Sequence, residues 1–180
     1  MSKNIVVVTG SPRVNGNSEM LADAFIEGAR ESGNTVTKFN AGKMNVKGCI
    51  ACKYCFSHDG ECVQKDDMQE ILKVLRQTDM IVLASPIYWF GFSAQLKAVI
   101  DRFYAGQSRG FPIESAALLL TYADTDEATA EATILNYKAV ISYLKWEDKG
   151  IIAQADVSAR GEIAGKESLD EARRLGKSIN

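Results

Sequence analysis

The sequence predicts an α/β fold in which helices cover both faces of a parallel sheet. Short apolar runs alternate along the chain with segments of helical hydrophobic periodicity. The runs are continuously apolar, as expected for strands buried on both faces. The 180 residues, of which 46% are hydrophobic, suit a single globular domain, and no linker, repeat or run of bilayer length interrupts them.

Five strands and five helices are expected. The strands fall at about residues 5–8, 35–39, 80–84, 116–120 and 150–153, and the helices at about 20–28, 66–75, 93–103, 126–145 and 168–179. Ser93 predicts an N-cap, whereas Asp66 with Gln69 and Ser168 with Glu171 predict capping boxes. Residues 41–65 have no sustained periodicity and form a Cys-rich loop insertion.

The stretch TGSPRVNGNS, residues 9–18, connects the first apolar run to the first helical pattern. Unpaired N–H groups and the macrodipole make such a helix N-terminus an anion site. The stretch is neither a Walker A loop nor a dinucleotide fingerprint, and an ordinary strand–helix turn would use similar residues. The candidate phosphate ligands are Ser11, Arg13, Gly16, Asn17 and Ser18.

The segment GSPRVNGNS closely resembles the phosphate loop of flavodoxin-like FMN proteins, in particular NADPH-dependent FMN reductases and iron–sulfur flavoproteins. The resemblance implies that the ligand is FMN. It also implies a flavodoxin-like three-layer sandwich, with a five-stranded parallel sheet of order 2-1-3-4-5. In such sheets a ligand lies beyond the strand C-termini, here between the first and third strands.

Residues 85–91, SPIYWFG, end the third predicted strand at the same place. Core packing is the usual role of clustered aromatic residues, but this position favours stacking on a flat isoalloxazine. The run SPIYWFGFSAQLKAVIDR is similar to the family's flavin-ring loop and the helix that follows it. The resemblance implies ring contacts from Pro86, Ile87, Tyr88, Trp89 and Phe90, and from Tyr122 and Ala123 in a third loop.

All four cysteines fall in one stretch, with the spacing C-x2-C-x2-C-x6-C. Thiolates at this spacing suit an iron–sulfur cubane better than zinc, which usually takes two separated C-x2-C pairs. Free thiols, a redox disulfide and zinc remain alternatives. The segment GCIACKYC also resembles the motif of iron–sulfur flavoproteins, which implies a [4Fe–4S] cluster on Cys49, Cys52, Cys55 and Cys62.

The single histidine lies in the cysteine loop, and no Ser-His-Asp or Cys-His arrangement is convincing, so we expect the cofactor rather than a catalytic side chain to carry the chemistry. The leading hypothesis is an FMN-dependent oxidoreductase that passes electrons from a ferredoxin-type protein or NAD(P)H to a quinone or other small oxidant, with a cluster. The alternatives are a cluster-free NAD(P)H-dependent FMN or quinone reductase, with or without structural zinc, and a flavodoxin-type carrier or flavin sensor.

Charge and family resemblance also set expectations about partners. The net charge of −2, without blocks of like charge, predicts no nucleic-acid or membrane-surface binding, and it is less acidic than flavodoxin carriers usually are. The N-terminus enters a strand without a signal-peptide pattern, so we expect a cytoplasmic protein. The resemblance implies a homodimer or homotetramer.

Overall fold

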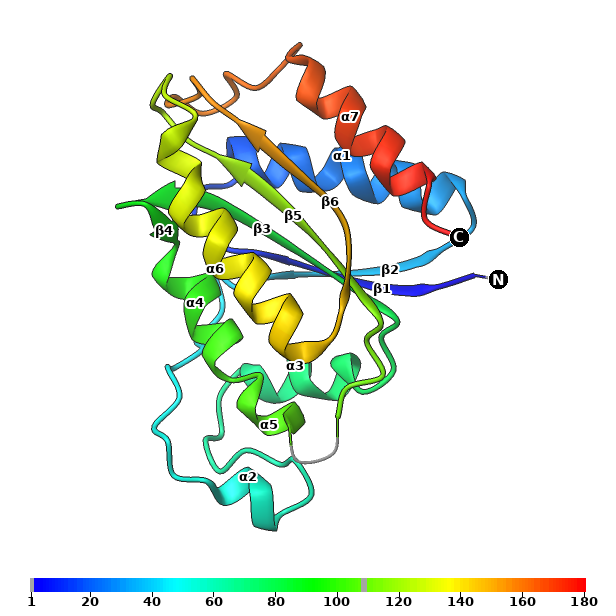
Figure 1. Cartoon of the computed structure of the whole chain (residues 1–180), viewed down its shortest axis with the longest axis vertical. Helices are drawn as coiled ribbons and strands as arrows, with labels where there is room; N and C mark the ends of the chain where they lie inside the picture. Colours follow the sequence, from blue (N-terminus) through cyan, green and yellow to red (C-terminus); the bar gives the residue numbers. More distant parts are fainter. Residues whose placement is uncertain (1, 108–109) are drawn as a thin grey trace.

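A computed structural model describes residues 2–107 and 110–180. Its sheet has the strand order β2-β1-β3-β5-β6 (Figure 1), and all pairings along this path are parallel. The strands are β1 (Asn4–Thr9), β2 (Thr35–Asn40), β3 (Met80–Tyr88), β5 (Ser115–Thr121) and β6 (Glu147–Gln154). The short β4 (Gly91–Phe92) pairs antiparallel with the end of β3. The predicted fold class and order are therefore confirmed, with one additional short strand.

Helices form a layer on each face of the sheet (Figure 1). One layer contains α1 (Asn17–Glu31) and α7 (Glu167–Lys177), and the other contains α3 (Met68–Leu75), α4 (Ala94–Asp101) and α6 (Ala128–Leu144). Two four-residue helices, α2 (Tyr54–Ser57) and α5 (Tyr104–Gln107), lie together at one end of the molecule. None of the helices in the described ranges is both long and apolar enough to cross a bilayer.

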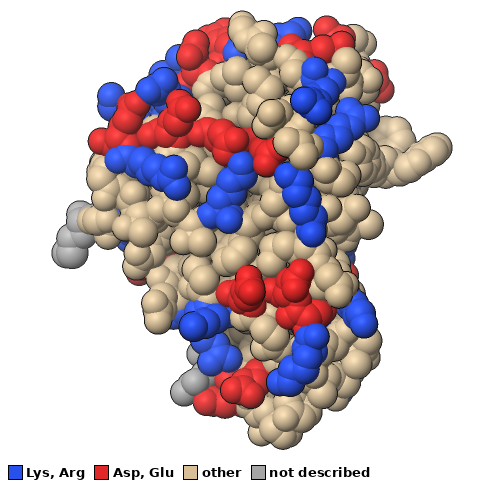
Figure 2. All heavy atoms as spheres, turned by 180° about the vertical axis from the view of Figure 1, so that it is seen from behind, with Lys and Arg blue, Asp and Glu red and all other residues tan. Residues whose placement is uncertain are grey.

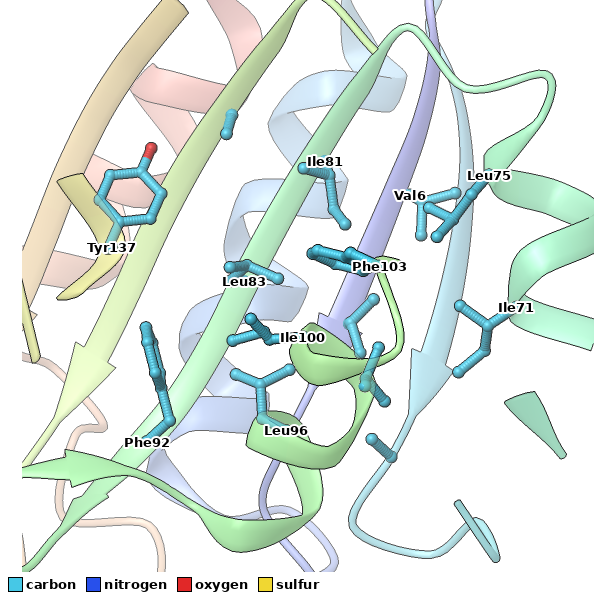
Figure 3. Packing of buried hydrophobic residues seen from close by; sticks show 14 of the residues in the cluster. Val6, Ile71, Leu75, Ile81, Leu83, Phe92, Leu96, Ile100, Phe103 and Tyr137 are labelled. Carbon is cyan, nitrogen blue, oxygen red and sulfur yellow. The ribbon is translucent and has the colours of Figure 1, made fainter. Parts of the chain in front are cut away.

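Each central strand contributes side chains to two hydrophobic clusters. In β1, Ile5 and Val7 pack with the α1 and α7 layer, whereas Val6 and Val8 pack with the opposite layer. In Figure 3, Ile81 of β3 lies near Phe103, which follows α4, within the second cluster. This two-sided burial explains why the strands are uninterrupted apolar runs in the sequence.

The aromatic segment is a hairpin rather than a simple loop at the end of a strand. The extended β3 continues through Pro86, which lies opposite Thr121, and then pairs with β4. The turn residues, Trp89 and Phe90, have φ angles of 48° and 61°. Positive φ angles at both central residues define the tight hairpin turn whose twist matches that of the strands. Such a turn usually has Asn or Gly at these positions. Sequence propensity therefore gave no indication of the turn.

The capping predictions had mixed outcomes. Ser93 caps α4, because its hydroxyl accepts the N–H of Leu96 at 3.4 Å. The predicted box at Asp66 is wrong: α3 begins at Met68, and the side chain of Gln69 donates to the carbonyls of Cys62 and Gln64.

The predicted box at Ser168 is also wrong. The helix α7 begins at Glu167, so Ser168 lies inside the first turn instead of at the N-cap. Its buried hydroxyl makes no hydrogen bond to the residues the structure describes.

The contact between α1 and α7 depends on two glycines. A Cβ atom on Gly28 would overlap the carbonyl of Arg173, and one on Gly176 would overlap the carbonyl of Phe25. We expect Gly28→Ala to lower the free energy of unfolding by about 1–3 kcal/mol, because overpacking outweighs the better helix propensity of alanine.

Urea unfolding of Gly28→Ala measures this effect. The matched control is Gly48→Ala, because nothing lies within 4 Å of the Cβ position at Gly48. Equal free energies of unfolding for Gly28→Ala and wild type would contradict the claim that the contact between α1 and α7 depends on glycine at residue 28.

Candidate functional site

The loop after β1 and the hairpin after β3 are joined by hydrogen bonds. The N–H of Gly10 donates to the carbonyl of Ala84 at 2.8 Å, which continues the pairing of the two strands. The hydroxyl of Ser93 donates to the carbonyl of Gly10 at 2.9 Å, and its N–H donates to the hydroxyl of Ser85 at 3.0 Å. A side chain on Gly10 would overlap Ser93, so the two loops approach each other closely only because residue 10 is glycine.

The first turn of α1 is open to an anion. Gly16 is its N-cap residue, and among the described residues no side chain caps this end. The first N–H groups of the helix therefore remain available to a ligand, where the helix dipole also favours negative charge. The one acidic side chain in this turn, Glu19, instead accepts the N–H of Asn15 at 2.7 Å.

A cavity of about 160 Å³ lies where these segments meet the ends of β5 and β6. It brings together nine of the residues predicted from the sequence. They are Ser11, Arg13, Asn17, Ser18, Pro86, Ile87, Tyr88, Tyr122 and Ala123. Gly16, Trp89 and Phe90 lie outside its lining; Trp89 is 95% exposed and Phe90 is 56% exposed at the tip of the hairpin.

Three lining residues were missed by sequence reasoning: Thr121, Val157 and Ser158. Ser158 follows the last strand of the parallel sheet, so its position at the carboxyl edge was the available signal. Its carbonyl accepts a hydrogen bond of 2.9 Å from the guanidinium of Arg13. The segment that follows the last strand is therefore part of the site.

The side chain of Asn17 also binds this segment. Its Nδ2 donates to the carbonyl of Ala159 at 2.9 Å, and its Oδ1 accepts the N–H groups of Gly161 and Ile163 at 3.0 and 3.3 Å. These three bonds occupy most of the hydrogen-bonding capacity of the amide. Asn17 thus holds the segment after β6 against the start of α1.

The cysteine loop lies at the other end of α4. Cys49, Cys52, Cys55 and Cys62 line one cavity of about 20 Å³, together with Arg102. Cys55 is buried and its Sγ lies 3.7 Å from the carbonyl of Tyr104. Burial raises the pKa of the Cys55 thiol, and the three other sulfurs add to this effect.

The donor set fits an iron–sulfur cluster in chemistry, since four cysteines line one space. The space itself is about the size of a single water molecule. In residues 2–107 and 110–180, no three His, Cys, Asp or Glu side chains are grouped closely enough to hold a metal ion. The cysteine side chains would therefore have to rearrange to take a cluster.

Fold and cavity together define a flavodoxin-like α/β protein with a cavity at the switch point of its sheet. The sequence pattern of one protein family, described as NADPH-dependent FMN reductase, matches residues 3–145 of this chain. The chain therefore belongs to this family, and it is a flavin-dependent oxidoreductase that uses FMN.

Two archaeal relatives are similar over almost the whole chain. An iron-sulfur flavoprotein of Archaeoglobus fulgidus is 31% identical over 179 residues, 97% of this chain and 77% of that protein. One of Methanocaldococcus jannaschii is 36% identical over 183 residues, 97% of this chain and 94% of that protein.

Among solved structures, an NAD(P)H:quinone oxidoreductase of Methanothermobacter marburgensis superimposes with a TM-score of 0.77 at 21% identity, over 98% of this chain and 96% of that one. An FMN-dependent NADH-azoreductase of Bacillus anthracis gives 0.73 at 15% identity, over 98% of both chains. At these identities the structures establish the shared fold.

The carboxylate of Glu19 supports the loop between β1 and α1 and links the stability of the protein to pH. Burial opposes ionisation, but donation from the N–H of Asn15 and the charge of Lys38 hold the pKa of Glu19 below its usual value. This stabilisation is fully present above the unfolded pKa of about 4.3 and is lost as the pH falls through the lower folded pKa.

We expect Glu19→Gln to cost about 1 kcal/mol of unfolding free energy at neutral pH and to flatten the loss of stability below about pH 4.3. Urea unfolding across this range measures both effects. The control is Glu171→Gln, which changes an exposed glutamate of α7 and should run parallel to wild type. A Glu19→Gln curve that also runs parallel to wild type would contradict the linkage.

Proposed function

We propose that this protein passes electrons from a ferredoxin-type protein or NAD(P)H to a quinone or other small oxidant, using FMN and a [4Fe–4S] cluster. The observation that carries the proposal is the presence of two separate sites in one chain. One is the cavity at the switch point beside the uncapped start of α1, and the other is the cavity lined by four cysteines. The names of the two archaeal relatives, which cover nearly the whole chain, support the same combination.

In this proposal the FMN phosphate binds the first N–H groups of α1, with Ser11, Arg13 and Ser18 as side-chain donors. Gly16 shapes the loop and Asn17 positions the segment after β6. The flavin ring is held by Pro86, Ile87, Tyr88, Tyr122 and Ala123. A flavin nucleotide is larger than this cavity, so its ring would extend along the hairpin, where Trp89 and Phe90 are exposed.

The cluster would be held by Cys49, Cys52, Cys55 and Cys62. When bound, FMN supplies hydride and single-electron chemistry, and the cluster supplies single-electron transfer. The balanced overall reaction with a nicotinamide donor consumes NAD(P)H, a proton and a quinone, and yields NAD(P)⁺ and hydroquinone. The protein's own contribution is to bind and orient the cofactors, because no catalytic side chain is proposed.

A cluster-free NAD(P)H-dependent FMN or quinone reductase is the second candidate. The observation that favours it is the absence of a ligating arrangement among the described cysteines, although all four are free. On this view the loop carries reduced thiols, and electrons pass between donor and acceptor through FMN alone.

We further propose a homodimer or homotetramer that works in the cytoplasm, where thiols stay reduced. Exposed aromatic residues support self-association: Trp89 is 95% exposed and Tyr143 is 71% exposed. On the face shown in Figure 2, acidic and basic side chains are interspersed. Such a face lacks the basic stripe that binds nucleic acid.

Anaerobic purification and reconstitution with iron and sulfide tests the proposed function. We expect flavin absorption bands, broad iron–sulfur absorption and about four irons per chain, with matching acid-labile sulfide. Cys52→Ser should lose the iron while retaining the flavin, because Cys52 is exposed and lies outside the flavin cavity. Ser57→Ala, a change elsewhere in the same loop, is the control and should keep both cofactors.

Each contradictory outcome identifies a different alternative. Flavin without iron after reconstitution would leave the cluster-free reductase. Stoichiometric zinc in place of iron would make the loop structural. Absence of bound flavin would contradict the proposal as a whole.

A further inference from the structure

Arg102 is a buried cation at the back of the cysteine loop. It directly follows α4, its side chain is 1% exposed, and it lines the same cavity as the four cysteines. Removing a guanidinium from water is costly unless other groups compensate its charge and satisfy its donors. We therefore ask which groups compensate the charge of Arg102 and accept its hydrogen bonds.

Two of its three nitrogens are satisfied by the ends of the cysteine loop. Nη1 donates to Asp66 Oδ2 and to the carbonyl of Lys47, both at 2.9 Å, and Nη2 donates to Asp66 Oδ1 at 3.1 Å. Asp66 also accepts the N–H of Lys47 at 2.9 Å. Lys47 precedes the first cysteine and Asp66 follows the last, so this fork closes the loop. The sequence assigned Asp66 to helix capping and gave no indication of this pairing with Arg102.

The third nitrogen, Nε, is buried and makes no hydrogen bond to any residue in the described ranges. A buried donor without an acceptor is destabilising and rare in native proteins. Cys62 lines the same small cavity as Arg102. Burial opposes the charged form, but the bond to Asp66 and the nearness of Cys62 hold the pKa of Arg102 above its usual value.

We propose that Arg102 is a positioning residue for the cysteine-bound cluster, that its Nε–H donates to the sulfur of Cys62 once the cluster is bound, and that its positive charge raises the reduction potential of the cluster. This inference rests on the proposed function, since it needs a cluster in the loop. A one-electron reduction adds a negative charge to the cluster, and a nearby cation or hydrogen-bond donor stabilises the more negative state. Asp66 opposes the effect, because its carboxylate partly cancels the charge of Arg102.

The experiment is a redox titration of the anaerobically reconstituted protein, followed by the EPR signal of the reduced cluster, with iron measured on each sample. We expect Arg102→Gln to lower the equilibrium constant for reduction roughly tenfold. For one electron this lowers the reduction potential by about 59 mV. Arg102→Lys, which keeps the charge but loses the fork, should give a smaller shift. The control is Lys97→Gln, which removes an exposed positive charge from α4 and should leave the potential unchanged.

Asp66→Asn distinguishes an effect of Arg102 on the reduction potential from a purely structural role in closing the cysteine loop. Removing the carboxylate leaves the charge of Arg102 uncompensated, so the potential should rise, opposite to the Arg102→Gln shift. A structural role alone would lower iron content in both variants and leave the potential of the loaded fraction where it is in wild type. If Arg102→Gln does not load iron, the direction in which Asp66→Asn shifts the reduction potential decides whether Arg102 affects the potential.

Two failures can be told apart. Iron-loaded wild type with an unshifted Arg102→Gln, or with an unchanged or lower potential in Asp66→Asn, overturns this inference and leaves the proposed function in place. Wild type that takes up no iron overturns the cluster proposal and this inference with it.

Discussion

The parallel pairing of β1 with β3 is the constraint on which the functional site depends. Its register places Thr9 opposite Ala84, and the N–H of Gly10 extends the ladder by one bond of 2.8 Å. Both strands therefore end together, and the loops that follow them are joined by the hydroxyl of Ser93, which donates to the carbonyl of Gly10. Because β5 and β6 also run parallel to β3, the segments that follow these two strands reach the same edge of the sheet.

The two sites are connected through the chain that follows β2. Gly42 donates its N–H to the carbonyl of Thr9 at 3.4 Å, and a side chain at residue 42 would overlap the backbone of Ser11. The start of the cysteine loop is thus packed against the loop between β1 and α1. The other end of the loop is fixed to α4 through the pair of Asp66 and Arg102.

Local sequence determined much of this arrangement in advance. Uninterrupted apolar runs gave the buried strands, and the small residues between Thr9 and Ser18 marked the loop that joins β1 to α1, because both signals depend on neighbours in the chain. What could not be predicted depends on distant partners. Asp66 pairs with a guanidinium 36 residues away, and Asn17 is occupied by a segment more than 140 residues away. The turn at Trp89 and Phe90 is held by strand pairing and by Thr133, whose hydroxyl donates to the carbonyl of Phe90, against the propensity of both residues.

The central claim is that the N-terminus of α1 and its loop bind the phosphate of FMN. Comparing the dissociation constants of FMN and riboflavin, for wild type and Arg13→Ala, tests it most directly. The account predicts that wild type binds FMN at least about tenfold more tightly than riboflavin, a difference of about 1.4 kcal/mol. Arg13→Ala should weaken FMN binding alone, and the matched change Arg174→Ala, on the exposed side of α7, should weaken neither. Equal affinity of wild type for the two flavins would contradict the account.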